Sequence, residues 1–199
     1  MPNIELVAFL LGVVTVVLVV RRSVWNYPFA LAMVSLYLII FFRERLYSDA
    51  LLQIFFFVIN VHGWLHWQRL RAETGDIRIL ALDRRQQGAL IIALVLVTLA
   101  WSFAMDRLTN ADFPYWDGAV AIVSVFAQIL QVRRYVESWI LWVLVDVAAI
   151  GLYWTKDLRL TALLYAVFLG LALWGYASWA AARRASLASA AVPGGAVND

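Results

Sequence analysis

The sequence contains no cysteine, a single lysine and few charged residues of either sign. Without cysteine, disulfides, thiolate metal sites, iron–sulfur clusters and cysteine nucleophiles are excluded. Charged residues make up 15% of the 199 positions, against about 25% in a typical soluble domain. Because no stretch with the composition of a soluble domain is left over, a secreted or cytosolic enzyme with an appended membrane anchor is also excluded.

Apolar residues dominate instead, with 64% of the chain in the set AVILMFWYC and a mean hydropathy of +0.81. A helix needs about 20 mostly apolar residues to cross the hydrocarbon core of a bilayer. The first apolar run has no basic residues before it and no small-residue cleavage site after it, so we expect an uncleaved span rather than a signal peptide. The sequence predicts an all-α membrane protein with seven transmembrane helices, near residues 4–20, 26–42, 50–68, 88–105, 117–132, 138–154 and 160–181.

The basic residues are distributed unevenly between the two sides that seven spans define. The loops after spans 1, 3 and 5, together with the C-terminal tail, hold 11 of the 16 basic residues. By the positive-inside rule, this side faces the cytoplasm. We therefore expect a multi-pass protein whose N-terminus lies outside and whose C-terminus is cytoplasmic.

An internal repeat relates the two ends of the chain. A shift of 112 residues places spans 1–3 on spans 5–7 and superimposes rare residues: Arg21-Arg22 on Arg133-Arg134, Gly63 on Gly175 and Trp67 on Trp179. Spans 1 and 5 are four apart and run in the same direction, so the halves are parallel repeats in a 3+1+3 plan. Parallel repeats with a site near the midplane are a transporter architecture. The predicted units are a first three-helix bundle (1–70), a cytoplasmic loop with the linker helix (71–116), a second three-helix bundle (117–182) and a disordered cytoplasmic tail (183–199).

Other classes of seven-helix protein and enzyme fit less well. A retinal Schiff base needs a lysine inside the bundle, and Lys156 lies in a predicted loop. His62 and His66 are four residues apart on one helix and could share a metal ion, but no helix rich in carboxylates accompanies them. We therefore predict no catalytic residues, no metal and no cofactor, and we expect a protein that is not an enzyme.

Candidate binding residues lie at helical spacing in span 3. Gln53, Asn60, Trp64 and Trp67 fall on one helix face, and Trp67, near the cytoplasmic end, is expected to be an interface anchor. Amides are costly in lipid unless they are paired, so this face is expected to point into the bundle. Asn60, which is close to mid-span, either contacts a ligand or hydrogen-bonds to a neighbouring helix.

Span 6 carries a second stripe, with Trp139, Trp142 and Asp146 at positions i, i+3 and i+7. A carboxylate inside a span costs about 2.5–3.5 kcal/mol on insertion scales and marks a functional site by default. Asp146 could pair with a cationic substrate, carry a coupling proton or bond to another helix. The tryptophans suit either a site or an interfacial belt. Two further candidates are Gln128, which is deeper in span 5 than Gln131, and Tyr165 of span 7.

Three motifs together resemble the PnuC-type vitamin transporters over nearly the whole chain apart from the tail. They are Leu52-Gln53-Ile54-Phe55-Phe56-Phe57 leading to Asn60 and Gly63-Trp64, then Asp112-Phe113-Pro114-Tyr115-Trp116-Asp117, then Arg134-Tyr135-Val136-Glu137-Ser138-Trp139-Ile140-Leu141-Trp142. The resemblance implies a facilitator in the bacterial inner membrane, with a 3+1+3 arrangement like that of SWEET carriers. It also implies downhill uptake, with trapping by a cytoplasmic kinase, and a site formed by the tryptophan pair and the amides of span 3.

The resemblance leaves the substrate open among nicotinamide riboside, thiamine and riboflavin. Asp146 stands where family members are expected to carry Asn, and a carboxylate there favours a permanent cation. We therefore expect nicotinamide riboside, with thiamine second and neutral riboflavin less favoured. Proton coupling and a vitamin sensor that does not transport stay open as alternatives. We expect a homo-oligomer in membrane lipid and no contact with nucleic acid.

Overall fold

The structure is a computed structural model that describes residues 2–43, 47–108, 114–155, 157 and 159–191. In these ranges each predicted apolar run forms a helix, which confirms an all-α membrane protein. The seven helices are α1 (Pro2–Val20), α2 (Asn26–Arg43), α3 (Tyr47–Thr74), α4 (Arg84–Leu108), α5 (Pro114–Val132), α6 (Ser138–Thr155) and α7 (Arg159–Ala191).

Six of these helices are long and apolar enough to cross a membrane, and the apolar part of α1, Leu6–Val20, is shorter. Large apolar side chains point outward along the helices, notably Ile91, Ile92 and Leu96 of α4. Inside a bilayer such side chains meet lipid, and the helices satisfy their own backbone hydrogen bonds. The fold therefore suits a membrane environment throughout the described helices.

Two helices extend further than the sequence predicted. The helix expected to end at residue 68 continues to Thr74, and the last helix continues to Ala191. The prediction of a disordered tail from residue 183 is thus wrong for 183–191, while 192–199 lie outside the described residues. Both extensions contain Ala, Arg and Leu, which favour helix once a helix is already nucleated.

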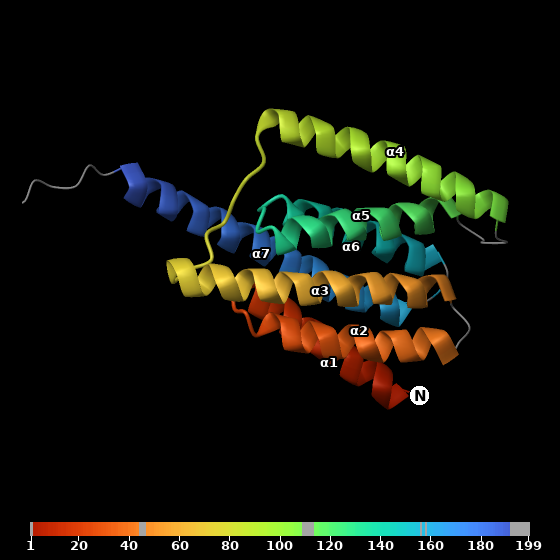
Figure 1. The fold of residues 1–199 in the computed structure, drawn as a ribbon. Helices are drawn as coiled ribbons and strands as arrows, with labels where there is room; N and C mark the ends of the chain where they lie inside the picture. The colour runs from red at the N-terminus through yellow and green to blue at the C-terminus, as the bar shows by residue number, and fades with distance from the viewer. Residues whose placement is uncertain (1, 44–46, 109–113, 156, 158, 192–199) are drawn as a thin grey trace, which may run out of the picture.

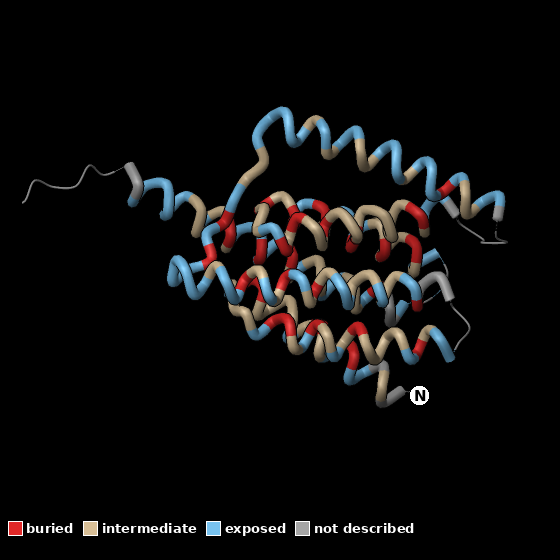
Figure 2. Tube along the Cα trace, in the orientation of Figure 1, coloured by how far each residue is buried: buried red, intermediate tan, exposed pale blue. Residues whose placement is uncertain are grey.

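Six helices form a closed ring, and one stands outside it. Each of α1, α2, α3, α5, α6 and α7 packs against two neighbours, in the order α1–α2–α3–α5–α6–α7 and back to α1. The remaining helix, α4, packs only against α5 and lies along one side of the molecule (Figure 1). Buried residues gather on the ring, whereas α4 is mostly exposed (Figure 2).

The two halves of the ring share the same residue spacing. Helices α5, α6 and α7 each begin 112 residues after α1, α2 and α3. The connecting loops match as well, since Arg22 donates its backbone N–H to Val19 O at 2.8 Å and Arg134 does the same to Gln131 O at 3.0 Å. Both arginines have a positive φ, 55° and 67°, which is uncommon for a residue other than glycine.

A matching packing unit holds each half together near these loops. The Tyr27 ring meets Trp67 edge-on at 5.4 Å over Gly63, and the equivalent Trp139 meets Trp179 at 5.5 Å over Gly175. A Cβ atom at Gly63 or Gly175 would lie 2.7 Å or 2.6 Å from the facing ring. Glycine is therefore required at both positions for close helix approach.

The two units are also joined across the ring. Trp67 donates its indole N–H to Val132 O at 2.8 Å, and Trp179 donates to Val19 O at 3.2 Å. Each bond runs from the third helix of one half to the end of the first helix of the other half. The halves are thus tied together at the end of the molecule that carries the two Arg-Arg pairs, called the arginine-rich end below.

Replacing Gly175 by alanine tests this packing. A methyl group at Gly175 would press on the Trp139 ring, so we expect Gly175→Ala to destabilise the protein by about 1–3 kcal/mol. The matched control is Gly170→Ala on the same helix, where nothing lies within 4 Å of the added Cβ atom. This control should keep or raise stability, by up to about 1 kcal/mol. Thermal unfolding in detergent measures both, and equal midpoints would contradict the packing role of Gly175.

Candidate functional site

A cavity of about 100 Å³ lies where the two halves of the ring meet. All five contributing helices belong to the ring, and α4 takes no part. The lining residues are Thr15 and Val19 of α1, Asn26, Tyr27, Ala30, Met33 and Val34 of α2, Phe56, Asn60 and Trp67 of α3, Gln128, Gln131 and Val132 of α5, and Trp142 of α6.

Two hydrogen-bonded pairs form the polar wall of the cavity. Gln128 donates from Nε2 to Asn60 Oδ1 at 3.0 Å, and Asn60 in turn donates from Nδ2 to Phe56 O at 2.8 Å. Three residues further along α5, Gln131 accepts a hydrogen bond at Oε1 from the indole N–H of Trp142. The pairs link α3 to α5 and α5 to α6. The three amides therefore retain further donor and acceptor capacity for a small molecule in the cavity.

The remaining wall is mainly aromatic and apolar. Tyr27, Phe56, Trp67 and Trp142 contribute ring surfaces, and Met33 contributes a polarisable thioether. Aromatic rings offer faces for stacking on a flat ligand, and they attract cations. A cavity with a few amides and several rings suits a small aromatic molecule with polar substituents.

The structure brings three of the predicted site residues together at the cavity: Asn60, Gln128 and Trp142. Gln53, Trp64, Trp139, Asp146 and Tyr165 do not line it. Gln53 and Asn60 share a helix face, but seven residues separate them by about 10 Å along the axis. One cavity of this size therefore reaches only the second of them.

The two tryptophans of span 6 have different environments. Trp139 is almost fully buried against Trp179 and Gly175, in a core cluster that also includes the partly buried Trp64. Trp142 lies three residues further along α6, lines the cavity and belongs to the partly buried edge of the same cluster. In this arrangement Trp139 packs α6 against α7 within the second half, and Trp142 is the ring that lines the cavity.

Asp146 lies one helical turn beyond Trp142 and is buried, with 4% of its surface exposed. Its electrostatic neighbours include Tyr165, which also interacts with Tyr37 and stacks on Tyr153 at 5.3 Å between ring centres. The carboxyl group and these phenols come from α2, α6 and α7. They form a second polar group between the cavity and the end of the ring opposite the arginine-rich end.

Sequence reasoning missed several cavity residues. The sequence favoured Gln128 over Gln131 as a site residue because Gln128 lies deeper in the span, yet both amides line the cavity. Tyr27, Asn26 and Met33 carry no motif of their own. The repeat contained a usable signal, because Tyr27 is the equivalent of Trp139, and a large ring at both positions indicates a shared packing role.

The two histidines do not form a metal site with other described side chains. The His62 and His66 rings are parallel with centres 6.3 Å apart. Among the residues that the structure describes, no group of three or more His, Asp, Glu or Cys side chains is placed to hold a metal ion. The histidines of α3 therefore stay outside the candidate site.

A ring of membrane helices around a polar and aromatic cavity defines a transport protein for a small molecule. A family profile described as nicotinamide mononucleotide transporter matches residues 3–181, and the chain belongs to this family. This confirms the resemblance inferred from the sequence. Because the family consists of transporters, the expectation that the chain is not an enzyme is also confirmed.

Characterised relatives span most of the chain. The nicotinamide riboside transporter PnuC of Escherichia coli (strain K12) is 30% identical over 201 aligned positions, covering 88% of this chain and 84% of the relative. The riboflavin/roseoflavin transporter RibM of Streptomyces davaonensis is 26% identical over 88% of this chain and 83% of its own. A crystal structure of the vitamin B3 transporter PnuC matches with a TM-score of 0.72 and 29% identity, covering 90% of this chain and 81% of that one.

A double-mutant cycle tests the amide pair at the cavity. Asn60→Leu, Gln128→Leu and the double substitution should give a coupling energy of about 0.6 kcal/mol, within the range seen for polar pairs between membrane helices. Unfolding in mixed detergent measures the free energies. A cycle that is additive within error would mean that the two side chains do not interact in the membrane protein.

Proposed function

We propose that the protein takes up nicotinamide riboside by facilitated diffusion through the cavity between the two halves. The observation that carries this proposal is a cavity lined by the amides of Asn60, Gln128 and Gln131 together with several aromatic rings. Nicotinamide riboside has a flat pyridinium ring, a carboxamide and ribose hydroxyls, and each of these groups finds a matching partner there. The relatives named nicotinamide riboside transporters support the same substrate.

In this proposal Trp142 and Tyr27 stack on the pyridinium ring, and Asn60, Gln128 and Gln131 bond to the amide and ribose groups. A cavity of about 100 Å³ is smaller than the roughly 300–1,000 Å³ of most ligand sites. The halves therefore have to separate to admit and release a nucleoside. Gln53, Trp64 and Tyr165 stay outside this inner contact set and are proposed to act along the path or in packing.

We further propose that the halves are parallel repeats in a 3+1+3, SWEET-like arrangement, with α4 as the linker. The shared spacing of 112 residues, the matching loop hydrogen bonds and the closed ring support this arrangement. Transport then follows from rocking of one half against the other around a fixed central site. The units 1–70, 71–116 and 117–182 correspond to the two halves and the linker between them.

The direction of transport follows from the proposed orientation in the bacterial inner membrane. We propose that the arginine-rich end faces the cytoplasm, because 11 of the 16 basic residues lie on that side. Uptake is then downhill, and phosphorylation of the nucleoside in the cytoplasm traps it. The expected homo-oligomer stays a prediction from the sequence.

Binding and flux measurements separate this proposal from its alternatives. We expect titration calorimetry to give micromolar binding of nicotinamide riboside, and proteoliposomes to take it up until the concentrations are equal on both sides. Thiamine and riboflavin serve as parallel ligands. Binding without flux would identify a vitamin sensor, accumulation driven by a pH gradient would identify proton coupling, and binding of thiamine alone would replace the substrate.

Asp146 is proposed to balance the positive charge of the pyridinium ring from one turn away. A buried carboxylate within about 8 Å of a cation contributes about 2 kcal/mol at an effective dielectric constant near 20. We therefore expect Asp146→Asn to weaken binding of nicotinamide riboside about tenfold or more, while any binding of neutral riboflavin is unchanged.

Asp106→Asn on the exposed end of α4 is the matched control, since it removes the same charge far from the cavity. It should leave binding of nicotinamide riboside unaltered. Equal affinities of Asp146→Asn and the parent protein for nicotinamide riboside would remove the charge-balance role and leave Asp146 as a residue that bonds to other helices.

A further inference from the structure

The segment between α3 and α4, residues 75–83, crosses the arginine-rich end of the ring (Figure 1). We call this segment the strap. Its two isoleucines are buried, with 2% of the surface of Ile77 and 7% of Ile79 exposed, although the strap lies in a polar connecting stretch. Both belong to the core cluster that contains Val19, Val20, Tyr27, Trp67, Val136, Trp139 and Trp179.

The strap lies next to the central cavity. Val19, Tyr27 and Trp67 line the cavity, and the same three residues belong to the cluster that buries Ile77 and Ile79. One layer of side chains therefore has the cavity on one side and the strap on the other. A molecule leaving the cavity toward the arginine-rich end meets this layer and then the strap.

The strap is firmly bonded to the second half of the ring. Leu80 donates its backbone N–H to Arg134 O at 2.9 Å and accepts a bond from Val136 N–H at 3.0 Å. The Leu82 N–H donates to Glu137 Oε1 at 3.0 Å. The motif from Arg134 to Trp142, which carried much of the family resemblance, thus holds the strap.

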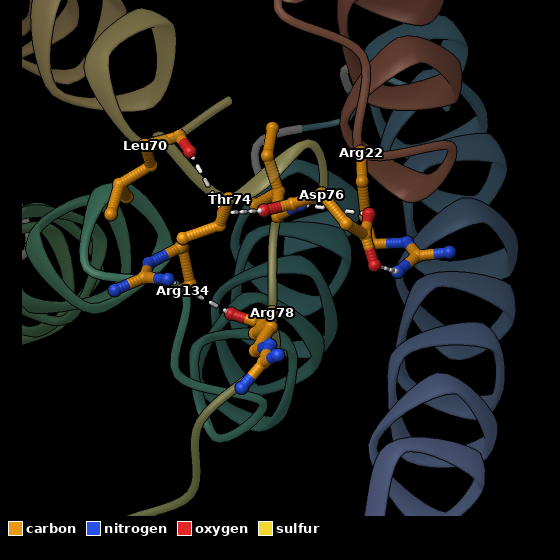
Figure 3. Close-up of polar contacts among 7 residues, drawn as sticks. Arg22, Leu70, Thr74, Asp76, Arg78 and Arg134 are labelled. Atoms are coloured by element: carbon orange, nitrogen blue, oxygen red, sulfur yellow. Dashed lines mark hydrogen bonds and ion pairs between the residues drawn. The ribbon is translucent and has the colours of Figure 1, made fainter. Parts of the chain in front are cut away.

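The Arg134 side chain adds a fourth bond, from Nη1 to Arg78 O at 3.2 Å (Figure 3). Arg134, with its left-handed backbone conformation, lies in the loop whose residues make all four of these bonds. Strain of this kind persists only where the surrounding structure fixes it. The loop after α5 and the strap therefore behave as one unit.

The polar contact of the strap with the first half is much weaker than its bonds to the second half. Arg22 Nη1 lies 3.4 Å from Asp76 Oδ2, and their side chains are 33% and 66% exposed. The pair borders a polar surface pocket of about 230 Å³ that Arg21 and Arg71 also line. An exposed ion pair of this kind contributes about 0–1 kcal/mol. Figure 3 shows this pair on one side of the strap and the Arg134 bond on the other.

A hinge lies where the strap leaves α3. Gly75 has a φ of +73°, and no atom lies within 4 Å of a Cβ atom built there. Thr74 Oγ1 lies within hydrogen-bond distance of both Leu70 O and Asp76 O, at 2.8 Å and 2.7 Å. A left-handed glycine with open space around it can absorb a large change in φ and ψ.

We propose that the strap is the gate of the cavity at the arginine-rich end. The strap moves together with the loop between α5 and α6. The gate opens when the Arg22–Asp76 contact breaks, Gly75 pivots and Ile77 leaves the side chains that the first half contributes to the core cluster. The inference rests on the proposed function, because it takes the central cavity as the transport path.

Reversible cross-linking tests the gate, and the cysteine-free chain gives no background thiols. One variant carries Arg22→Cys with Asp76→Cys, which joins the strap to the first half. The matched variant carries Leu80→Cys with Tyr135→Cys, which joins the strap to the second half. Both are reconstituted into proteoliposomes, treated with the same flexible bis-methanethiosulfonate reagent and assayed for uptake of nicotinamide riboside.

We expect cross-linking of the first pair to reduce uptake to the level of empty vesicles, with recovery after dithiothreitol. Cross-linking of the second pair should leave uptake as it was before treatment. If uptake survives the first cross-link, the strap is not a gate. If both cross-links abolish uptake equally, the strap does not move together with the second half. The parent protein in the same vesicles tests the proposed function separately, since it carries no thiol.

A second measurement needs no substrate and no transport. The thiol of Ile77→Cys should react slowly with a polar maleimide, because the side chain at this position is buried. Adding Asp76→Ala removes the Arg22 contact and should raise the labelling rate severalfold. The control adds Asp157→Ala instead, which breaks the exposed Asp157–Arg159 pair elsewhere in the chain. Equal rates with Asp76→Ala and with Asp157→Ala overturn the proposal.

Discussion

A backbone carbonyl at the end of a helix has no partner within that helix, and an apolar environment makes an unpaired carbonyl costly. In this protein Val132 O at the end of α5 obtains the indole N–H of Trp67 from the opposite half, and Val19 O near the end of α1, which also accepts the Arg22 N–H, obtains that of Trp179. These two bonds set where the halves touch. Because Trp67 also lines the cavity, the same contact fixes where the cavity lies.

Helix positions could be predicted from the sequence because polar residues interrupt apolar runs at each end. The helical period also identified the faces that carry Asn60 and Trp142. It could not tell how far along a helix the partner lies, so Gln53 was grouped with Asn60 and Trp139 with Trp142. Ile77 and Ile79 were hidden in a stretch interpreted as a polar loop. Ile77 and Ile79 alternate with the charged Arg78, and this period of two residues is typical of a half-buried extended segment. The sequence therefore contained a signal that both isoleucines are buried.

The two halves of the ring match in the positions of their helices but differ in the side chains at equivalent positions. Trp142 and Asp146 are equivalent to Ala30 and Val34, which are small or apolar residues at the cavity. At these equivalent positions a ligand in the cavity therefore meets the Trp142 ring on the side of the second half and the small Ala30 and Val34 on the side of the first half, while Asp146 lies one turn beyond the cavity. The ends differ too, because α3 stops before Gly75, whereas α7 continues through the equivalent Leu187. Only the first half thus provides a strap.

Helix α4 touches the ring through α5 alone, and its outward face is apolar. In the proposed 3+1+3 arrangement, α4 sets the direction of the second half, because a single additional crossing returns the chain to its starting side before that half begins. With three helices per half and no linker, the second half would insert upside down, and the indoles of Trp67 and Trp179 would point to opposite membrane surfaces. In that proposed arrangement, a helix with few contacts to the ring allows two halves of the same orientation to face each other across one substrate.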